Sequence, residues 1–144
     1  MADIRRINDQ ISVAPQIEPA DLADIAQQGF VAVINNRPDD EDAGQPAGEA
    51  VRAAAEAQGM LYHAIPVTQA GFSANQVEAM RAAIDAANGP VLAYCRSGTR
   101  STNLWALAQA SKGDRPDHLI EQAAGAGYNL TGLRPLLDQL SGKA

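Results

Sequence analysis

The stretch that decides the fold is Pro90-Val91-Leu92-Ala93-Tyr94-Cys95-Arg96-Ser97-Gly98-Thr99-Arg100-Ser101. An apolar run leads into the only cysteine of the chain, and a helical pattern carrying Leu104, Trp105 and Leu107 follows the polar residues. A strand that ends in a loop and opens a helix directs several backbone N–H groups at one point, where the helix dipole adds positive charge. Such a point binds anions and favours a thiolate. The stretch therefore predicts a nucleophilic Cys95 inside an anion-binding loop.

The residues around Cys95 argue that it is functional. A lone cysteine is most often a small core residue. The polar residues that follow are poor core fillers, whereas hydroxyl and guanidinium groups suit an oxyanion. Arg100 offers a planar fork of donors, and glycine allows a left-handed backbone or a close approach. We predict that Arg100 is catalytic and that the loop binds substrate through Arg96, Ser97, Gly98 and Thr99.

Composition limits the class of protein. The 144 residues are expected to form one domain, residues 1–144, with its own core. A net charge of −6 argues against nucleic-acid and anionic-membrane partners. One cysteine and two histidines leave neither an internal disulfide nor a metal site, and no motif indicates a cofactor. Without a signal peptide or a span of ~20 apolar residues, the protein is expected to be cytoplasmic, and its oligomeric state is left open.

Strand and helix patterns alternate up to Cys95. Apolar runs predict strands at 11–14, 30–35, 61–67 and 90–94. The run at 30–35 is apolar on both faces, which favours a central position in the sheet. Helical patterns begin at Pro19, Ala47 and, after a Ser73/Gln76 capping box, at residue 74; three more cover 98–112, 116–126 and 131–141. The pattern predicts an α/β fold with a mainly parallel central sheet flanked by helices and an all-helical C-terminal part.

A cysteine followed after four residues by Arg100 and then Ser101 fits two mechanisms. In the first, the thiolate attacks a phosphomonoester and forms a cysteinyl-phosphate, which water cleaves. The loop N–H groups and Arg100 would hold the phosphoryl oxygens, and Ser101 would donate a hydrogen bond to the sulfur. In the second, the thiolate accepts a sulfane sulfur and becomes a persulfide. The expected substrate is a small oxyanion-bearing molecule, either a phosphomonoester or a thiosulfate or persulfide donor.

Two family resemblances bear on this choice. The run Cys95–Ser101 resembles a rhodanese active loop, whereas the usual signature of tyrosine and dual-specificity phosphatases has one more residue between Cys and Arg. Rhodanese domains usually continue with another strand, but this chain continues with helices, as dual-specificity phosphatases do. A closer resemblance is to the bacterial phosphatase-like domain found alone or fused to β-lactamase-like hydrolases, some members of which are labelled sulfurtransferases. Besides the active loop, it is carried by Ile11–Gln16, Val33–Glu41, Tyr62–Val67 and Ala126–Leu130. It implies a dual-specificity-phosphatase-like fold.

The chain departs from the phosphatase pattern at two places. The residue before the nucleophile is usually His and here is Tyr94. The region that usually holds a general-acid Asp is Pro66-Val67-Thr68-Gln69-Ala70-Gly71, without a carboxylate. Gln69 can bind substrate or position water, but it cannot protonate a leaving group.

The acidic run Asp39-Asp40-Glu41-Asp42 is the other possible source of a proton. Asp39 and Asp40 follow a predicted parallel strand and lie at the sheet edge of the Cys95 loop, so they are candidate general acids. The alternative is a solvated acidic loop. Arg37, just before them, either binds substrate or pairs with Asp39 or Asp40.

The function predicted from these patterns is a cysteine-dependent, phosphatase-like hydrolase. The alternatives are a rhodanese-type sulfurtransferase that uses the same cysteine and a weakly catalytic module that binds an anion or phosphopeptide. Three remaining residues are expected to be structural: His63 as a hydrogen-bonded core residue, His118 as a surface residue and Trp105 as core packing.

Overall fold

The computed structural model describes residues 2–68 and 70–142. Five strands form one sheet in the order β1-β2-β5-β3-β4, and all neighbours are parallel except β1 and β2. The strands are β1 (Arg5–Arg6), β2 (Ile11–Ala14), β3 (Ala32–Asn35), β4 (Leu61–Ala64) and β5 (Val91–Tyr94). The predicted α/β fold with a mainly parallel sheet is therefore confirmed.

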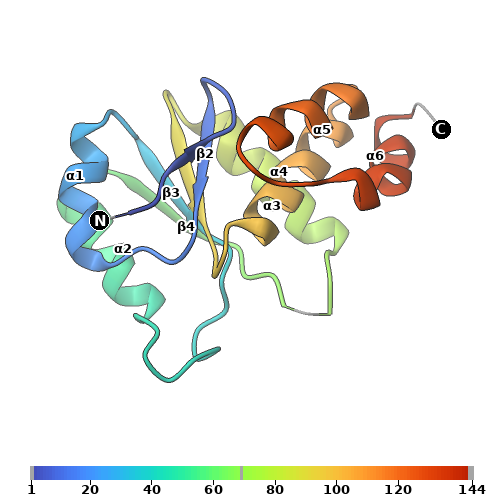
Figure 1. Ribbon diagram of the computed structural model, residues 1–144. Coiled ribbons are helices and arrows are strands. Elements are labelled where there is room, and N and C mark those ends of the chain that lie inside the picture. The colour runs from blue at the N-terminus through green and yellow to red at the C-terminus, as the bar shows by residue number, and fades with distance from the viewer. Residues whose placement is uncertain (1, 69, 143–144) are drawn as a thin grey trace.

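Helices cover both faces of the sheet (Figure 1). One face carries α1 (Leu22–Gln27), which follows the 3-10 turn η1 (Pro19–Asp21), and α2 (Gly48–Ala57). The other face carries α3 (Ala74–Ala86), α4 (Thr99–Ser111), α5 (Pro116–Gly125) and, after η2 (Thr131–Leu133), α6 (Arg134–Ser141). Among the described residues no strand follows β5, so the C-terminal part is helical as predicted.

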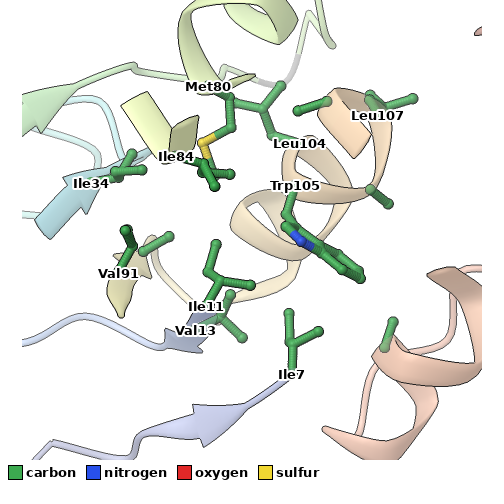
Figure 2. Close-up of a cluster of buried hydrophobic side chains, with 14 of the residues drawn as sticks. Ile7, Ile11, Val13, Ile34, Met80, Ile84, Val91, Leu104, Trp105 and Leu107 are labelled. Atoms are coloured by element: carbon green, nitrogen blue, oxygen red, sulfur yellow. The ribbon is translucent and has the colours of Figure 1, made fainter. Parts of the chain in front are cut away.

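Alternate residues of the central strands supply the two halves of the core. In β5, Val91 and Ala93 face α3 and α4, whereas Leu92 and Tyr94 face α1 and α2. Figure 2 shows the larger half, where Ile11, Ile34 and Val91 meet the side chains of α3 and α4. Trp105 lies there fully buried, which confirms the prediction that it packs in the core. This packing fixes β5 and α4, the two elements that flank the Cys95 loop.

Several predicted boundaries were wrong. The strand predicted over 61–67 ends at Ala64. Pro66 has no N–H to donate, so the regular ladder stops there, although the Ile65 and Val67 N–H groups still donate to the Asn35 and Asn36 carbonyls at 2.9 Å. The strand predicted from residue 30 begins at Ala32, and the helix predicted over 131–141 divides into η2 and α6. The two-residue strand β1 was not predicted, because so short an element leaves no period in the sequence. No helix in the described part of the chain is long and apolar enough to cross a membrane.

Candidate active site

Cys95 follows the last residue of β5 at the carboxyl edge of the sheet. Its backbone N–H donates to the Ala14 carbonyl at 3.3 Å, and the Tyr94 carbonyl accepts from the Asn36 N–H at 2.8 Å. The residue is fully buried. Neighbouring parallel strands thus fix the nucleophile from both sides.

The loop after Cys95 turns back onto the sulfur. Gly98 has φ = 91°, a left-handed conformation, and its N–H donates to the Cys95 Sγ at 3.1 Å. Helix α4 begins at the next residue, so its N-terminus faces the sulfur. Ser97 and Thr99 are exposed and joined by a hydrogen bond of 3.0 Å between their hydroxyls. The geometry is that of an anion-binding loop around a thiol.

Arg100 lies in the first turn of α4 and is held by partners from other segments. Its Nη1 and Nη2 donate to the two carboxylate oxygens of Glu41 at 2.7 and 2.8 Å, and Nη1 also donates to the Val67 carbonyl at 2.7 Å. The guanidinium also interacts with the Cys95 sulfur, by hydrogen bonding and by charge. Hydrogen bonding to Glu41, and then the charge of a Cys95 thiolate, raise the pKa of the Arg100 guanidinium. Arg100 therefore lies close enough to Cys95 to hold an oxyanion against it.

A second arginine anchors the same carboxylate. Arg37 is buried and donates through Nε to Glu41 at 2.9 Å, through Nη2 to Asp42 at 2.7 Å and through Nη1 to the Gln16 side chain at 3.0 Å. Hydrogen bonds from Arg100, and also from Arg37, lower the pKa of Glu41 from 4.5 to about 2. Glu41 is thus a permanent anion at neutral pH. Of the two roles predicted for Arg37, pairing with Asp39 or Asp40 was wrong, because its partners are the next two carboxylates, whereas substrate binding stays a prediction.

The two predicted acids are not the carboxylates that these arginines bind. The Asp39 Oδ1 accepts from the Gly48 N–H at 2.8 Å, at the start of α2. Asp39 also lines a cavity of about 270 Å³, together with Arg37 and Tyr62 among others. Asp40 is exposed and has φ = 65°, at the turn of the loop. Because Asp39 and Arg37 line the same cavity, Asp39 stays a predicted general acid. The role of Asp40 as an acid also stays a prediction.

Other predicted residues have mixed outcomes. Ser101 is fully buried, and its Oγ makes no hydrogen bond to a described residue, so the predicted bond to the sulfur is not formed in this structure. Gln69 lies outside the described residues. His63 is half-buried in β4, and its Nε2 has no described partner, so the expected hydrogen bond is absent there. His118 is exposed on α5, as predicted.

Two further contacts could not be predicted from the Cys95–Ser101 motif. Gln16 supports Arg37, and the Tyr128 hydroxyl donates to the Ser97 carbonyl at 3.0 Å. Both residues lie in segments remote from Cys95 in the sequence and are brought to it only by the fold. Tyr94, in the place of the usual His, is buried on the opposite face of the sheet from α4, and burial raises the pKa of its phenol.

Among the described residues, no group of three or more His, Cys, Asp or Glu side chains is placed to hold a metal ion. The described chemistry of the site is that of one thiol, a set of backbone donors and arginines.

Known proteins are similar to this chain in sequence and in fold. The model of the family described as beta-lactamase hydrolase-like protein, phosphatase-like domain, matches residues 3–112. A beta-lactamase hydrolase-like protein from Agrobacterium fabrum is 39% identical over 108 residues, which are 75% of this chain and 25% of that protein. The chain thus spans about a quarter of the length of that relative.

Solved structures share the whole fold. A crystal structure of a candidate phosphatase from Neisseria meningitidis has a TM-score of 0.82 and 38% identity, with 95% of this chain and 97% of that chain covered. The crystal structure of Tk-PTP in its active form has a TM-score of 0.74 and 19% identity, with 98% of this chain and 97% of that chain covered. At this identity the similarity is one of fold only. The α/β fold is that of dual-specificity and tyrosine phosphatases. The chain belongs to the family of phosphatase-like domains of beta-lactamase hydrolase-like proteins.

Proposed function

We propose that this domain is a cysteine-dependent phosphatase that acts on a phosphomonoester. The Cys95 thiolate attacks phosphorus, so that an S–P bond forms, the P–O bond to the leaving group breaks, and the leaving oxygen takes a proton. Water then attacks the cysteinyl-phosphate, the S–P bond breaks, and the thiolate and inorganic phosphate are released.

The observation that carries the proposal is the set of donors gathered at Cys95. The Gly98 N–H donates to the Cys95 sulfur, and Glu41 fixes the Arg100 guanidinium, which also interacts with that sulfur. A guanidinium fixed in this way binds phosphoryl oxygens without reorganising during the reaction. The cost of ordering Arg100 is met in the folded state, before substrate arrives.

The proton on the leaving group needs a source. Glu41 is hydrogen-bonded to Arg100, but its pKa of about 2 keeps it ionised at neutral pH, so it has no proton to give. Asp39, beside its cavity, and Asp40 remain the proposed acids. Without an acid, phosphates with good leaving groups would react far faster than alkyl phosphates.

A second function is favoured by this lack of an acid at Arg100. In sulfur transfer, the Cys95 thiolate would attack the outer sulfur of thiosulfate, its S–S bond would break, and sulfite would leave with the electron pair. Cys95 becomes a persulfide, and no proton donor is required. The same anion-binding loop serves both reactions.

The deciding experiment is intact-mass measurement after separate incubation with an aryl phosphomonoester and with thiosulfate. A phosphatase is expected to gain the mass of one phosphoryl group transiently and to release phosphate over many turnovers. A gain of one sulfur atom from thiosulfate, faster than any phosphate release, would replace the proposal by the sulfurtransferase. Cys95→Ser is the control and should show neither adduct.

A third outcome would also overturn the proposal. If phosphate binds the loop but no adduct and no turnover occur with either donor, the domain is an anion- or phosphopeptide-binding module. If the protein does hydrolyse phosphomonoesters, the general acid can be identified by measuring the rates of Asp39→Asn and Asp40→Asn on substrates whose leaving groups differ in pKa. Loss of the proton donor should reduce alkyl phosphate hydrolysis and leave aryl phosphate hydrolysis nearly unchanged.

A further inference from the structure

The Tyr128 hydroxyl contacts the backbone of the Cys95 loop from a remote segment. It donates to the Ser97 carbonyl at 3.0 Å and packs against Gly98, where an added Cβ would lie 2.1 Å from the Tyr128 Oη. Tyr128 follows α5 and lies outside the part of the chain matched by the family model, residues 3–112.

One peptide group joins this tyrosine to the nucleophile. The Ser97 carbonyl and the Gly98 N–H are opposite ends of a single planar peptide unit. Tyr128 bonds to the carbonyl end, and the N–H end donates to the Cys95 Sγ at 3.1 Å. A peptide that accepts a hydrogen bond at its oxygen is polarised and becomes a stronger donor at its nitrogen.

We propose that Tyr128 is a positioning residue that acts through the Ser97–Gly98 peptide to orient and strengthen the N–H bond to the Cys95 thiolate. The inference deepens the proposed function, since it assumes that the thiolate of Cys95 is the reactive form. It holds for phosphoryl and for sulfur transfer, because both need that thiolate.

Tyr128 is itself held firmly enough for this role. Its side chain is largely buried, its own N–H donates to the Ala123 carbonyl at 2.9 Å, and the Arg5 guanidinium lies 5.4 Å from its ring centroid. Burial raises the pKa of the Tyr128 phenol, so the hydroxyl keeps the proton that it donates. Position 98 therefore requires glycine for two reasons: its φ is left-handed, and Tyr128 occupies the space that a Cβ would need.

The test is a titration of the thiolate in Tyr128→Phe, with Tyr62→Phe as the matched control. The Tyr62 hydroxyl also makes a hydrogen bond, which it accepts from the Asn35 side-chain N–H at 2.9 Å and which does not involve the Cys95 loop. Because Cys95 is the only cysteine, thiolate absorbance reports on it alone when the spectrum of the matching Cys95→Ser variant is subtracted. This measurement needs no reagent to reach the buried sulfur.

Tyr128→Phe should shift the midpoint of the Cys95 titration upward by about 0.5–1 pH unit, a roughly 3- to 10-fold loss of thiolate at lower pH. Tyr62→Phe should leave the midpoint in place, even if it lowers the unfolding temperature by the same amount. Equal midpoints in both variants and the wild type would overturn the inference and leave Tyr128 as a structural residue.

The titration separates this inference from the proposed function. A shifted midpoint in a protein that hydrolyses no phosphomonoester would support the role of Tyr128 and reject the phosphatase. An active phosphatase with an unshifted midpoint would do the reverse. A Tyr128→Phe protein that fails to fold is replaced by Gly127→Ala. That change disturbs the left-handed residue before Tyr128 (φ = 96°) and should shift the midpoint in the same direction.

Discussion

Two loops meet at the candidate site, and they are built from different interactions. The Cys95 loop, residues 95–98, is held by backbone hydrogen bonds, a left-handed glycine and a largely buried tyrosine. The acidic loop, residues 38–45, is held largely by side-chain contacts in which Glu41 and Asp42 pair with arginines. The first loop places the nucleophile, and the second places the guanidinium beside it.

The difference in construction implies a difference in sensitivity. Buried backbone bonds depend little on salt or pH, whereas ion pairs at partly exposed side chains are screened and titrate. Changes in the Cys95 loop should therefore act on the fold and the thiolate together. Changes in the acidic loop should act on anion binding, with an effect that depends on conditions.

Arg100→Lys should have the largest effect, because Arg100 lies in the first turn of α4, directly after the Cys95 loop, but is oriented by the acidic loop. Lysine keeps the charge but cannot hold both Glu41 oxygens and an oxyanion at once. We expect a loss of 2–4 kcal/mol in transition-state stabilisation, which is roughly 30- to 1,000-fold in kcat/KM. Steady-state kinetics on an aryl phosphate, or on thiosulfate, measure it. Wild-type kcat/KM in this variant would mean that Arg100 does not contact the substrate.

Gly98→Ala tests the backbone construction of the Cys95 loop. The left-handed φ of 91° and the contact with the Tyr128 Oη should together cost about 2 kcal/mol of folding free energy, measured by urea unfolding. Gly29→Ala is the control, because Gly29 has φ = 98° but nothing within 4 Å of an added Cβ.

The tyrosine contact can then be isolated. Gly98→Ala should be less destabilising in a Tyr128→Phe background, because phenylalanine lacks the oxygen that meets the Cβ. If the cost equals that of Gly29→Ala in both backgrounds, the Tyr128 hydroxyl does not crowd position 98.

Glu41→Gln probes the acidic loop directly. Glu41 has a lowered pKa of about 2 in the folded protein, so its contribution to stability is complete above its unfolded pKa of 4.5 and is lost as the pH falls from about 4.5 to 2. Its side chain is 22% exposed, so we expect about 1–2 kcal/mol after screening by solvent. At pH 7, Glu41→Gln should lose that amount, and its stability should fall less than that of the wild type below pH 4.5.

The same variant should lower kcat/KM by roughly 10-fold, since one amide oxygen no longer fixes both nitrogens of Arg100. Glu49→Gln is the matched control. Glu49 pairs with Arg52 at the surface, with 77% of its side chain exposed, so neither activity nor acid stability should change measurably. An unaltered kcat/KM in Glu41→Gln would show that Arg100 is oriented by other contacts.

The sequence predicted the Cys95 loop better than its surroundings, for a physical reason. Strand, loop and helix around Cys95 are contiguous, so local spacing and the apolar pattern place the sulfur at the helix N-terminus. The alternation of strands and helices likewise predicted the parallel sheet. These features depend on the order of residues along the chain.

The contacts made by the acidic loop could not be predicted in the same way. The sequence placed Asp39–Asp42 at the correct sheet edge, but it could not tell which carboxylate meets which arginine. The left-handed turn at Asp40 directs Glu41 to Arg100, and the N-terminus of α2 binds Asp39. Tyr128 was missed as a contact of the Cys95 loop because only the packed helices bring it to Ser97 and Gly98.

Arg96→Ala should have the smallest effect, because Arg96 forms only a weak, exposed ion pair with Asp42 of the acidic loop. The Arg96 Nε lies 3.5 Å from Asp42, and their side chains are 66% and 48% exposed, so the pair should contribute under about 0.5 kcal/mol to folding. As a solvated positive charge beside the anion site, Arg96 should instead raise the association rate of an anionic substrate. We expect KM to rise about 2- to 3-fold at low salt in Arg96→Ala, with kcat unchanged, and the difference to disappear near 1 M salt, where the Debye length is ~3 Å. Kinetics at several salt concentrations measure this. A fall in kcat that survives high salt would place Arg96 in direct contact with the reacting phosphoryl group, and the acidic loop would then bear on chemistry through a second arginine.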